Sequence, residues 1–378
     1  MNASLSSSIH ADPICHLVRA QPDEVVAYFC PETLQATAHR FMRGFGGVVS
    51  YAVKANARPE VLENLVAAGV RVFDVASPGE MRAARAACPV AVLHYNNPVR
   101  SVAEVAEAVR MGVVSYSVDS DSELDKLAGV GAGVEVSVRL ALPIKGAAYD
   151  FGAKFGVGPE AAVGLLRRVV AMGFSPAITF HPGTQCSEAA AWEAYIHAAA
   201  DVARRAGVGL ARLNVGGGFA AHRLGAAPDL EAVFARISAA VAVAFDGAVP
   251  GLVCEPGRAM VSEAFVLAAR VKALRPDGSV FLNDGIYGGL AEWPSIVASD
   301  RVRAVAPDGF LRSGAARARV VFGPTCDSLD RLPEPMPLAG DLAEGDYVLF
   351  YGMGAYSLAL STQFNGYGLG QPVTVSRL

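Results

Sequence analysis

The run GVVSYAV at residues 47–53 and the lysine that follows it, Lys54, decide how the rest of the chain is interpreted. The run is apolar and rich in β-branched residues, which is typical of a buried strand. Beyond it, Pro59 and Glu60 open a segment with helical spacing. We therefore expect Lys54 where a buried strand passes into a helix. Burial favours a neutral amine, and a neutral amine can form a Schiff base with an aldehyde or ketone. A solvated lysine at a strand end is the alternative.

Composition narrows the class of protein. Of the 378 residues, 52% are hydrophobic and 18% are charged, so we expect a large core and little disorder. A net charge of −4 argues against nucleic acid and anionic membranes as partners. The six cysteines are scattered without paired spacing, which favours reduced thiols in the cytoplasm. The first residues lack a secretion-signal pattern, no run is long enough to span a bilayer, and the histidines form no metal-binding motif.

Strand-like and helix-like segments alternate between residues 48 and 255. Eight strands are expected, at residues 48–54, 70–75, 90–94, 113–118, 134–140, 177–181, 210–215 and 251–255. Helical segments are expected between them, for example at residues 78–87, 102–110, 122–127, 159–172, 188–206 and 230–245. This alternation predicts parallel strands with helical crossovers. Eight such units in roughly 200 residues favour a (β/α)8 barrel over a doubly wound open sheet, which is the alternative.

The character of the chain changes after about residue 262. Apolar runs separated by glycine and proline predict an antiparallel β domain, with strands near residues 265–268, 280–282, 319–322, 347–351 and 373–375. We therefore assign residues 25–262 to the barrel and residues 263–378 to the β domain. Residues 1–24 would join that second domain as an extended arm or edge strand. A strand at 25–30 and a helix from Pro31 to about Arg43 are expected before the barrel.

Functional groups of such a barrel lie at the C-terminal ends of its strands. Six expected strand ends carry polar residues or glycines: Lys54, Asp74, Arg139, HPGT at 181–184, GGG at 216–218 and EPGR at 255–258. Each has a purely structural explanation, such as a helix cap, a core histidine, a tight turn or an ion pair. Glycine amides can also approach an anion closely. Together these groups suit one ligand that carries both a phosphate and a carbonyl group.

A series of motifs identifies a family. In chain order these are YAVKAN (51–56), FDVAS (73–77), HPGTQC (181–186), LNVGGGF (213–219), CEPGR (254–258), LNDGIYGG (282–289), GPTCDSLD (323–330), MGAYS (353–357) and FNGY (364–367). From about residue 25 to about residue 368 the chain resembles the fold-type III pyridoxal-phosphate decarboxylases of the ornithine/lysine/arginine group. The resemblance implies an alanine-racemase-like barrel, a C-terminal β domain, bound pyridoxal 5'-phosphate, and a homodimer with its active sites at the subunit interface.

The resemblance also implies roles for single residues. Lys54 would hold the cofactor as a Schiff base, Glu255 would accept a hydrogen bond from the pyridine N–H, and His181 would lie against the ring. The remaining cofactor-binding residues would be Gly216, Gly217, Gly218, Gly257, Arg258, Tyr356 and Thr184 around the phosphate, with Asp74 and Arg139 around Lys54. Thr184 stands where the family often has serine. A carboxylate at Glu255 keeps the ring nitrogen protonated, which strengthens the ring as an electron sink.

The substrate side of the site would come from the partner subunit. Cys326 would donate a proton to the substrate carbon, and Asp327, with Tyr287, would bind the distal cation of the substrate. The family's second substrate carboxylate would fall at Ile296, which departs from the pattern. We take Glu292 as its replacement, with Asp300 as the other candidate; Trp293 and Pro294 would shorten the pocket.

The expected reaction is pyridoxal-phosphate-dependent α-decarboxylation of a basic L-amino acid, foremost L-ornithine to putrescine in polyamine biosynthesis. Decarboxylation of lysine, arginine or diaminopimelate is an alternative, although the diaminopimelate branch typically has a glutamate where this chain has Asp327. An amino-acid racemase is another, although racemases of this fold usually have an arginine where this chain has Glu255. From a different class, a non-enzymatic cofactor carrier or a decarboxylase regulator stays open. The β domain, Lys54 and Cys326 argue against both.

Overall fold

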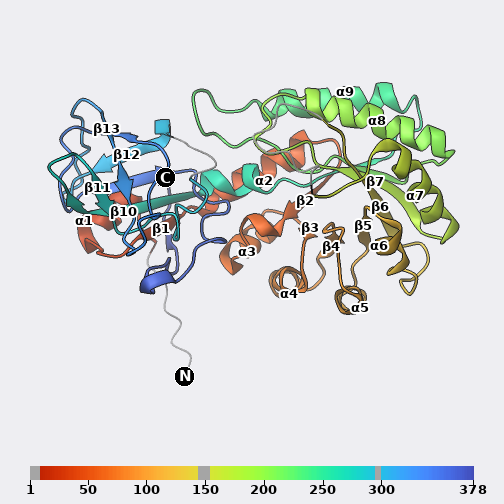
Figure 1. The fold of residues 1–378 in the computed structure, drawn as a ribbon, viewed down its shortest axis with the longest axis horizontal. Coiled ribbons are helices and arrows are strands. Elements are labelled where there is room, and N and C mark those ends of the chain that lie inside the picture. The colour runs from red at the N-terminus through yellow and green to blue at the C-terminus, as the bar shows by residue number, and fades with distance from the viewer. Residues whose placement is uncertain (1–8, 144–153, 294–298) are drawn as a thin grey trace. The chain divides into compact units, whose positions relative to one another are not determined.

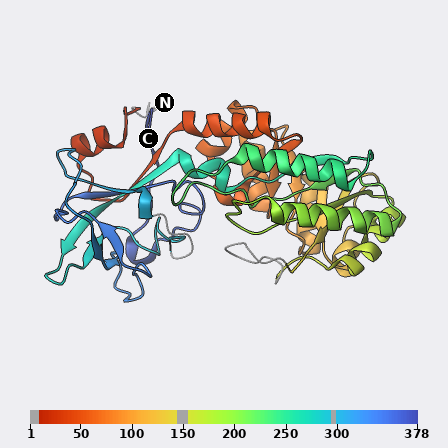
Figure 2. The same ribbon diagram turned by 90° about the horizontal axis from the view of Figure 1, so that it is seen from above.

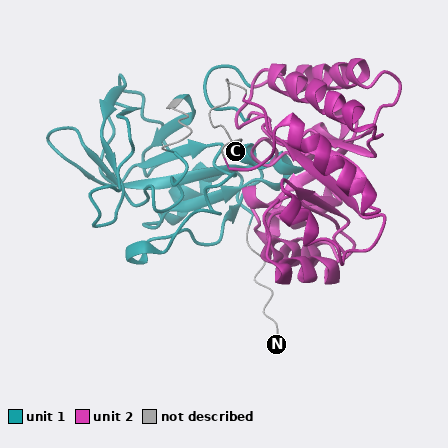
Figure 3. Ribbon diagram, turned by 45° about the vertical axis from the view of Figure 1, so that its right-hand side comes forward, with its two compact units in different colours: residues 1–36, 221–227, 261–378 teal, residues 37–220, 228–260 magenta. Residues whose placement is uncertain are grey.

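The computed structural model describes residues 9–143, 154–293 and 299–378. Its internal contacts divide the chain into two compact units (Figure 3). Residues 37–220 and 228–260 form the barrel unit, and residues 1–36, 221–227 and 261–378 form the sheet unit. The barrel unit is therefore smaller than the expected range of 25–262, because residues 25–36, 221–227 and 261–262 belong to the sheet unit.

Eight parallel strands close into a barrel, so the expected (β/α)8 architecture is confirmed and the open sheet is not. The strands are β2 (Val48–Ala52), β3 (Val72–Val75), β4 (Val92–Tyr95), β5 (Ser115–Val118), β6 (Glu135–Leu140), β7 (Ser175–Phe180), β8 (Arg212–Asn214) and β9 (Gly251–Cys254). Closure is made by β9 pairing with β2, where Val48 lies opposite Val253. Every strand begins and ends within two residues of its expected position.

Helices surround the strands of the barrel unit (Figures 1 and 2). They are α3 (Pro59–Ala67), α4 (Pro78–Ala87), α5 (Val102–Arg110), α6 (Asp121–Asp125), α7 (Pro159–Ala171), α8 (Ala190–Ala206) and α9 (Leu230–Ala244), with the short turn η1 (Val53–Ala55) after β2. Two more, α2 (Pro31–Gly44) and α10 (Arg258–Val261), cross from one unit into the other along the chain. Capping residues stabilise the first turns of several of these helices. On α5, for example, Ser101 and Glu104 form a capping box. None of the described helices is long and apolar enough to cross a bilayer.

An aromatic cluster anchors the loop that follows β8. The ring of Phe219 lies 5.0 Å from Trp192 of α8 and 5.7 Å from Phe234 of α9, measured between ring centroids. Trp192 also donates its indole N–H to the Val215 carbonyl at 3.2 Å. Because these rings are buried, they hold both ends of the 216–218 glycine segment against the outer helices.

The sheet unit contains a seven-stranded sheet and a two-stranded one. Its strands are β1 (Val26–Phe29), β10 (Phe265–Leu274), β11 (Val280–Leu282), β12 (Val302–Val305), β13 (Arg317–Arg319), β14 (Val321–Phe322), β15 (Met336–Leu338), β16 (Tyr347–Tyr351) and β17 (Val373–Thr374), with 3-10 turns η2 (Ser262–Ala264), η3 (Ser299–Arg301) and η4 (Phe364–Gly366). Pairing is mainly antiparallel, as expected, but the β1–β17 and β11–β14 pairs are parallel.

Two differences concern the N-terminal segment. Residues 13–20 form a helix, α1 (Pro13–Ala20), and not the extended arm expected from the sequence. Asp12 caps it by accepting the Cys15 N–H at 2.8 Å, and Pro13 occupies its first turn, where proline is tolerated. The second difference is β1, which pairs with β10 and β17 of the sheet unit. All four residues of β1 are buried, and such an apolar pattern does not encode a pairing partner.

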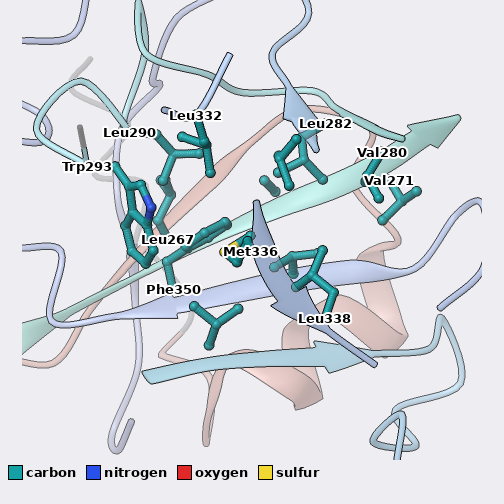
Figure 4. Close-up of a cluster of buried hydrophobic side chains, with 14 of the residues drawn as sticks. Leu267, Val271, Val280, Leu282, Leu290, Trp293, Leu332, Met336, Leu338 and Phe350 are labelled. Atoms are coloured by element: carbon teal, nitrogen blue, oxygen red, sulfur yellow. The ribbon is translucent and has the colours of Figure 1, made fainter. Parts of the chain in front are cut away.

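The core of the sheet unit gathers apolar side chains from β10, β11, β15 and β16 (Figure 4). Trp293 belongs to it, with its ring edge-on to Phe350 at 5.2 Å between centroids and only 4% of its surface exposed. Trp293 therefore packs in this core, and the suggestion that it shortens a substrate pocket stays a prediction. Pro294 and Ile296 lie outside the described residues.

Candidate active site

Lys54 lies at the mouth of the barrel, in the η1 turn directly after β2. Its Nζ is 3.8 Å from Oδ2 of Asp74, at the end of neighbouring β3. The Lys54 side chain is 46% exposed, whereas that of Asp74 is 4% exposed. The burial expected to neutralise the amine is thus absent, and the lysine is accessible to a ligand. The Ala52 N–H donates to the Pro256 carbonyl at 3.2 Å, which ties this turn to the segment after β9.

Two carboxylates and an arginine share the mouth with Lys54. Burial raises the pKa of Asp74, while the charge of Lys54, a hydrogen bond with Asn96 and the charge of Arg139 oppose that rise. Burial and the charge of Asp74 raise the pKa of Glu255 to about 7, against the opposing effects of Lys54, Asn214 and Arg139. Arg139, on β6, lies over the Phe155 ring at 5.3 Å. The mouth therefore balances two cations against two acidic groups.

His181 follows β7 and supplies a neutral ring. Its Nδ1 accepts the Gly183 N–H at 3.2 Å. Burial, followed by the positive charges of Lys54 and Arg139, holds the pKa of His181 well below its ordinary value. An uncharged imidazole beside Lys54 is suited to stacking on a flat aromatic ligand.

The glycines after β8 leave no space for side chains. A Cβ on Gly216, whose φ is +68°, would lie 2.0 Å from the Phe180 carbonyl oxygen. A Cβ on Gly217 would lie 2.8 Å from the Glu255 carbonyl oxygen and 3.1 Å from Nε2 of His181. Gly218 has a φ of +88°. The backbone here approaches the neighbouring strand ends as only glycine allows, and its amides form a cradle of the kind that binds phosphate.

Other expected cofactor residues lie on adjoining segments of the barrel unit. Cys186 donates its N–H to the Gly218 carbonyl at 2.9 Å, so the loop that carries half-buried Thr184 is joined to the glycines. A Cβ on Gly257 would lie 3.1 Å from the Cβ of Ala55, which keeps the segment after β9 close to the Lys54 turn. Arg258 is buried at the start of α10.

The sheet unit brings Cys326, Asp327 and Tyr287 together. Cys326 is exposed, and its N–H donates to Oδ1 of Asn365 at 3.1 Å. Asp327 accepts the Tyr287 hydroxyl at 2.6 Å and the Leu329 N–H at 2.9 Å. These two hydrogen bonds hold the pKa of Asp327 below its ordinary value, so the carboxylate is ionised at neutral pH.

The remaining predicted residues also lie in the sheet unit. Glu292 is half-buried in a turn closed by the Ala291 N–H bonding to the Gly288 carbonyl at 3.2 Å. Tyr356 is half-buried with a φ of +57°. Asp300, the other candidate for the second carboxylate, accepts the Gly225 N–H at 3.0 Å and so has a structural partner.

Three residues near these sites carried no role in the sequence analysis. Asn96 and Asn214 both donate to Glu255, from β4's end and from β8. Asp330 is buried within the GPTCDSLD loop and accepts three hydrogen bonds from the segments around it. Asn214 and Asp330 fall inside the recognised motifs, and their place in these motifs could have predicted a role for them. For Asn96 the sequence offered only its position at the end of an expected strand.

Comparison with known proteins agrees with this geometry. Residues 32–262 match the family described as pyridoxal-dependent decarboxylase, pyridoxal binding domain. The chain is 33% identical over 339 residues to the lysine/ornithine decarboxylase of Selenomonas ruminantium, covering 85% of this chain and 81% of that protein. It is 28% identical over 351 residues to the ornithine decarboxylase of Mus musculus, covering 84% and 73%. The solved structure of a lysine/ornithine decarboxylase from Vibrio vulnificus, complexed with cadaverine, matches with a TM-score of 0.81 at 25% identity, over 95% of this chain and 96% of that one.

A closed barrel with a lysine, a glycine cradle and a buried carboxylate at its mouth defines a site for a phosphate-bearing carbonyl cofactor. The chain belongs to the family of pyridoxal-dependent decarboxylases, which are carboxy-lyases of basic amino acids. The expected fold, family and enzyme class are thereby confirmed, and pyridoxal phosphate is the cofactor. The residues present fit it: the cradle that a Cβ would fill suits the phosphate, neutral His181 suits the ring, and Lys54 is the exposed amine.

Proposed function

We propose that the protein converts L-ornithine to putrescine and CO2, a step of polyamine biosynthesis. The observation that carries the proposal is the ionised Asp327 carboxylate beside Cys326, held by Tyr287 and the Leu329 N–H. A fixed carboxylate favours a substrate whose side chain ends in an ammonium or guanidinium group. The wider family accepts basic amino acids, and Asp327 supplies the matching charge.

The barrel unit would hold the cofactor. Lys54 would bond to its carbonyl carbon, His181 would lie against its ring, and the Glu255 carboxylate would accept its ring N–H. The phosphate would be held by the amides of Gly216, Gly217 and Gly218, with Gly257, the Arg258 guanidinium and the Thr184 hydroxyl. Tyr356, which belongs to the sheet unit, would add its hydroxyl to the phosphate. Asp74 and Arg139 would set the charge around Lys54. When bound, pyridoxal phosphate supplies an electron-withdrawing ring that accepts the electron pair of the broken Cα–carboxyl bond.

The sheet unit would bind the substrate and place a proton. Asp327 would accept hydrogen bonds from the distal ammonium, Tyr287 would fix the carboxylate's orientation, and Glu292 would supply the second negative group. As the Cα–carboxyl bond breaks, CO2 leaves without its electron pair. The Cys326 thiol would then give its proton to the same carbon, forming a new C–H bond, and recover a proton from solvent.

We also propose a homodimer in which Cys326 and Asp327 of one copy serve the Lys54 set of the other. The exposure of Cys326 on the surface of its own unit supports this arrangement. Lys54→Ala and Cys326→Ala should each be nearly inactive, and mixing the two should restore activity to about a quarter of wild type, because half the dimers then hold one complete site. Mixtures that stay inactive despite subunit exchange would refute the shared site.

The substrate is tested by incubating the purified, cofactor-loaded protein with L-ornithine, L-lysine, L-arginine and meso-diaminopimelate. We expect CO2 release to be fastest with ornithine and putrescine to be the dominant product. Dominant cadaverine or agmatine would keep the mechanism but overturn the substrate. Bound cofactor without CO2 from any of the four would point to racemisation, which chiral analysis detects, or to a carrier or regulator.

Two carboxylate variants refine this assay. Glu292→Gln should raise KM for ornithine by about 10-fold, because an ionic contact to the distal ammonium is lost. Asp300→Asn is the matched control, since that side chain bonds to the Gly225 N–H. Equal effects of the two variants would remove Glu292 from the substrate site.

A further inference from the structure

Glu255 is held by two asparagine side chains that reach it from different strands of the barrel. The Asn96 amide nitrogen donates to Oε1 of Glu255 at 2.5 Å, and the Asn214 amide nitrogen donates to the same oxygen. All three side chains are buried, with 4–7% of each residue exposed. Both hydrogen bonds from the described residues therefore end on one oxygen of the carboxylate.

The contacts of Asn214 fix which way its amide points. Its Oδ1 accepts the Gly216 N–H at 2.9 Å, and only an oxygen can accept that proton. The amide nitrogen must then face Glu255. Asn214 consequently connects the first glycine of the cradle to the Glu255 carboxylate.

Asn96 lies between the two acidic groups of the mouth. In addition to its bond with Glu255, it is one of the groups that oppose the rise in the pKa of Asp74. The backbone carbonyl oxygen of Asn96 accepts a hydrogen bond from the Ser117 hydroxyl at 2.8 Å, which holds the main chain at this position. An amide nitrogen has two protons, and the bond to Glu255 uses one of them.

We propose that Asn96 and Asn214 form an amide clamp that fixes Glu255 through Oε1 and thereby presents Oε2 to the ring N–H of the bound cofactor. This inference rests on the role proposed above for Glu255. Neither asparagine touches the reacting atoms, so both are positioning residues. The clamp also aligns the two ends of the cofactor site, because Asn214 holds the phosphate cradle and the ring carboxylate in one chain of hydrogen bonds.

The clamp favours the ionised form of Glu255 against its surroundings. Burial and Asp74 of β3 oppose that form, while Lys54 of η1 and Arg139 of β6 favour it, and the pKa of Glu255 comes to about 7. His181, on the loop after β7, is held neutral. A hydrogen bond to a charged acceptor is worth roughly 1.5–3 kcal/mol, which corresponds to about one to two pH units in a titration midpoint.

The test compares Asn96→Ala and Asn214→Asp with the matched control Asn97→Ala. Asn97 is the adjacent asparagine, and it donates to the Ala76 carbonyl at 3.3 Å instead of to Glu255. Asn214→Asp keeps the side-chain volume and the oxygen that accepts the Gly216 N–H, but it replaces the donor to Glu255 with a second carboxyl group. Its shift therefore includes like-charge repulsion, and Asn96→Ala measures the loss of a donor alone. Circular dichroism checks folding.

The first readout is the titration of the Glu255 carboxyl in cofactor-free protein, followed by its infrared carbonyl band and assigned with Glu255→Gln. We expect the midpoint to rise by about one pH unit in Asn96→Ala, by more than that in Asn214→Asp because of the added carboxyl group, and to stay unchanged in Asn97→Ala. Unmoved midpoints in both clamp variants, or an equal shift in the control, would overturn the proposal.

The second readout is the Kd for pyridoxal phosphate, measured at pH 7.5 by equilibrium dialysis. We expect this Kd to be about 10-fold higher, and binding correspondingly weaker, in both clamp variants. A shifted titration with an unchanged Kd would overturn the presentation of Oε2 to the cofactor. Neither readout uses an amino-acid substrate. A wrong substrate assignment would therefore change the product panel and leave both readouts intact, whereas a wrong clamp would leave the midpoints at the wild-type value whatever the product is.

Discussion

Asp330 holds the loop that carries Cys326 and Asp327, and its replacement gives a prediction with a calculable size. The Asp330 side chain is buried. Oδ1 accepts the Ile286 N–H at 3.0 Å, and Oδ2 accepts the N–H and hydroxyl of Thr325 at 3.1 Å and 2.8 Å. A Cβ on Gly285 would lie 2.1 Å from Oδ1, so the Asp330 carboxylate packs directly against the Gly285 backbone.

Asp330→Ala removes three hydrogen bonds to a charged acceptor. At roughly 1.5 kcal/mol each, their loss amounts to about 4–5 kcal/mol. The variant also lacks the unfavourable free energy of desolvating a buried carboxylate, and this offsets part of the stability lost with the hydrogen bonds. We therefore expect the free energy of unfolding to fall by about 3 kcal/mol. Asp308→Ala is the control, because within the described ranges that exposed carboxylate accepts one N–H, from Phe310. Its effect should be under about 1 kcal/mol.

Urea denaturation of the cofactor-free protein measures this effect. The chain has two tryptophans, Trp192 in the barrel unit and Trp293 in the sheet unit, so a Trp192→Phe background lets Trp293 fluorescence report on the unit that contains Asp330. The same variant should lose kcat and keep its Kd for pyridoxal phosphate within about 2-fold, because the loop carries the proton donor and not the cofactor residues. A stability loss below about 1 kcal/mol, or a parallel loss of cofactor affinity, would refute the reasoning.

Three further variants test other parts of the structure. Gly216→Ala should weaken cofactor binding by at least about 10-fold, because its Cβ would lie 2.0 Å from the Phe180 carbonyl oxygen; Gly207→Ala, at a similar φ of +69° but in open space, should leave the Kd unchanged. Burial raises the pKa of Asp284 from its ordinary 3.8 to about 7, so the folded chain holds an extra proton between those pH values and loses stability as pH rises through them. Asp284→Asn should therefore show a shallower fall in Tm from pH 4 to pH 7, and an unchanged slope would contradict this assignment. Cys326→Ala should slow decarboxylation by about 100-fold and produce aldehyde by-products from misplaced protonation, whereas an unchanged product spectrum would remove its role.

The barrel was predictable from local pattern. Its strands are short β-branched runs, buried on both faces and separated by well-capped helices, so each period is visible without knowledge of its neighbours. The partner of β1 was not predictable in the same way, because Val26–Phe29 is equally apolar on both faces and its pairing with β10 joins residues far apart in the chain. Helix α1 was missed although Asp12 and Pro13 form a helix-start signal.

The residues of the candidate site divide in the same way, into those that the local sequence reveals and those that depend on the closed fold. Lys54, His181, Glu255 and the glycines were found because they end predicted strands and occupy recognisable motifs. Asn96 was not found, since its partner Glu255 is 159 residues away and the contact exists only once the barrel has closed. The exposure of the Lys54 side chain could not be predicted from the sequence either, because the folding of the neighbouring loops decides whether a residue at a strand end is buried or exposed.

The central claim is that the amine of Lys54 binds the cofactor, and one measurement tests it most directly. The chain has five lysines, at positions 54, 126, 145, 154 and 272, so peptide mapping after borohydride reduction of the cofactor-loaded protein assigns the linkage without ambiguity. We predict that the peptide containing Lys54 gains the mass of a reduced pyridoxyl phosphate and that Lys54→Ala shows no labelled peptide. Label on another lysine in the wild-type protein, or no label at all, would contradict the account.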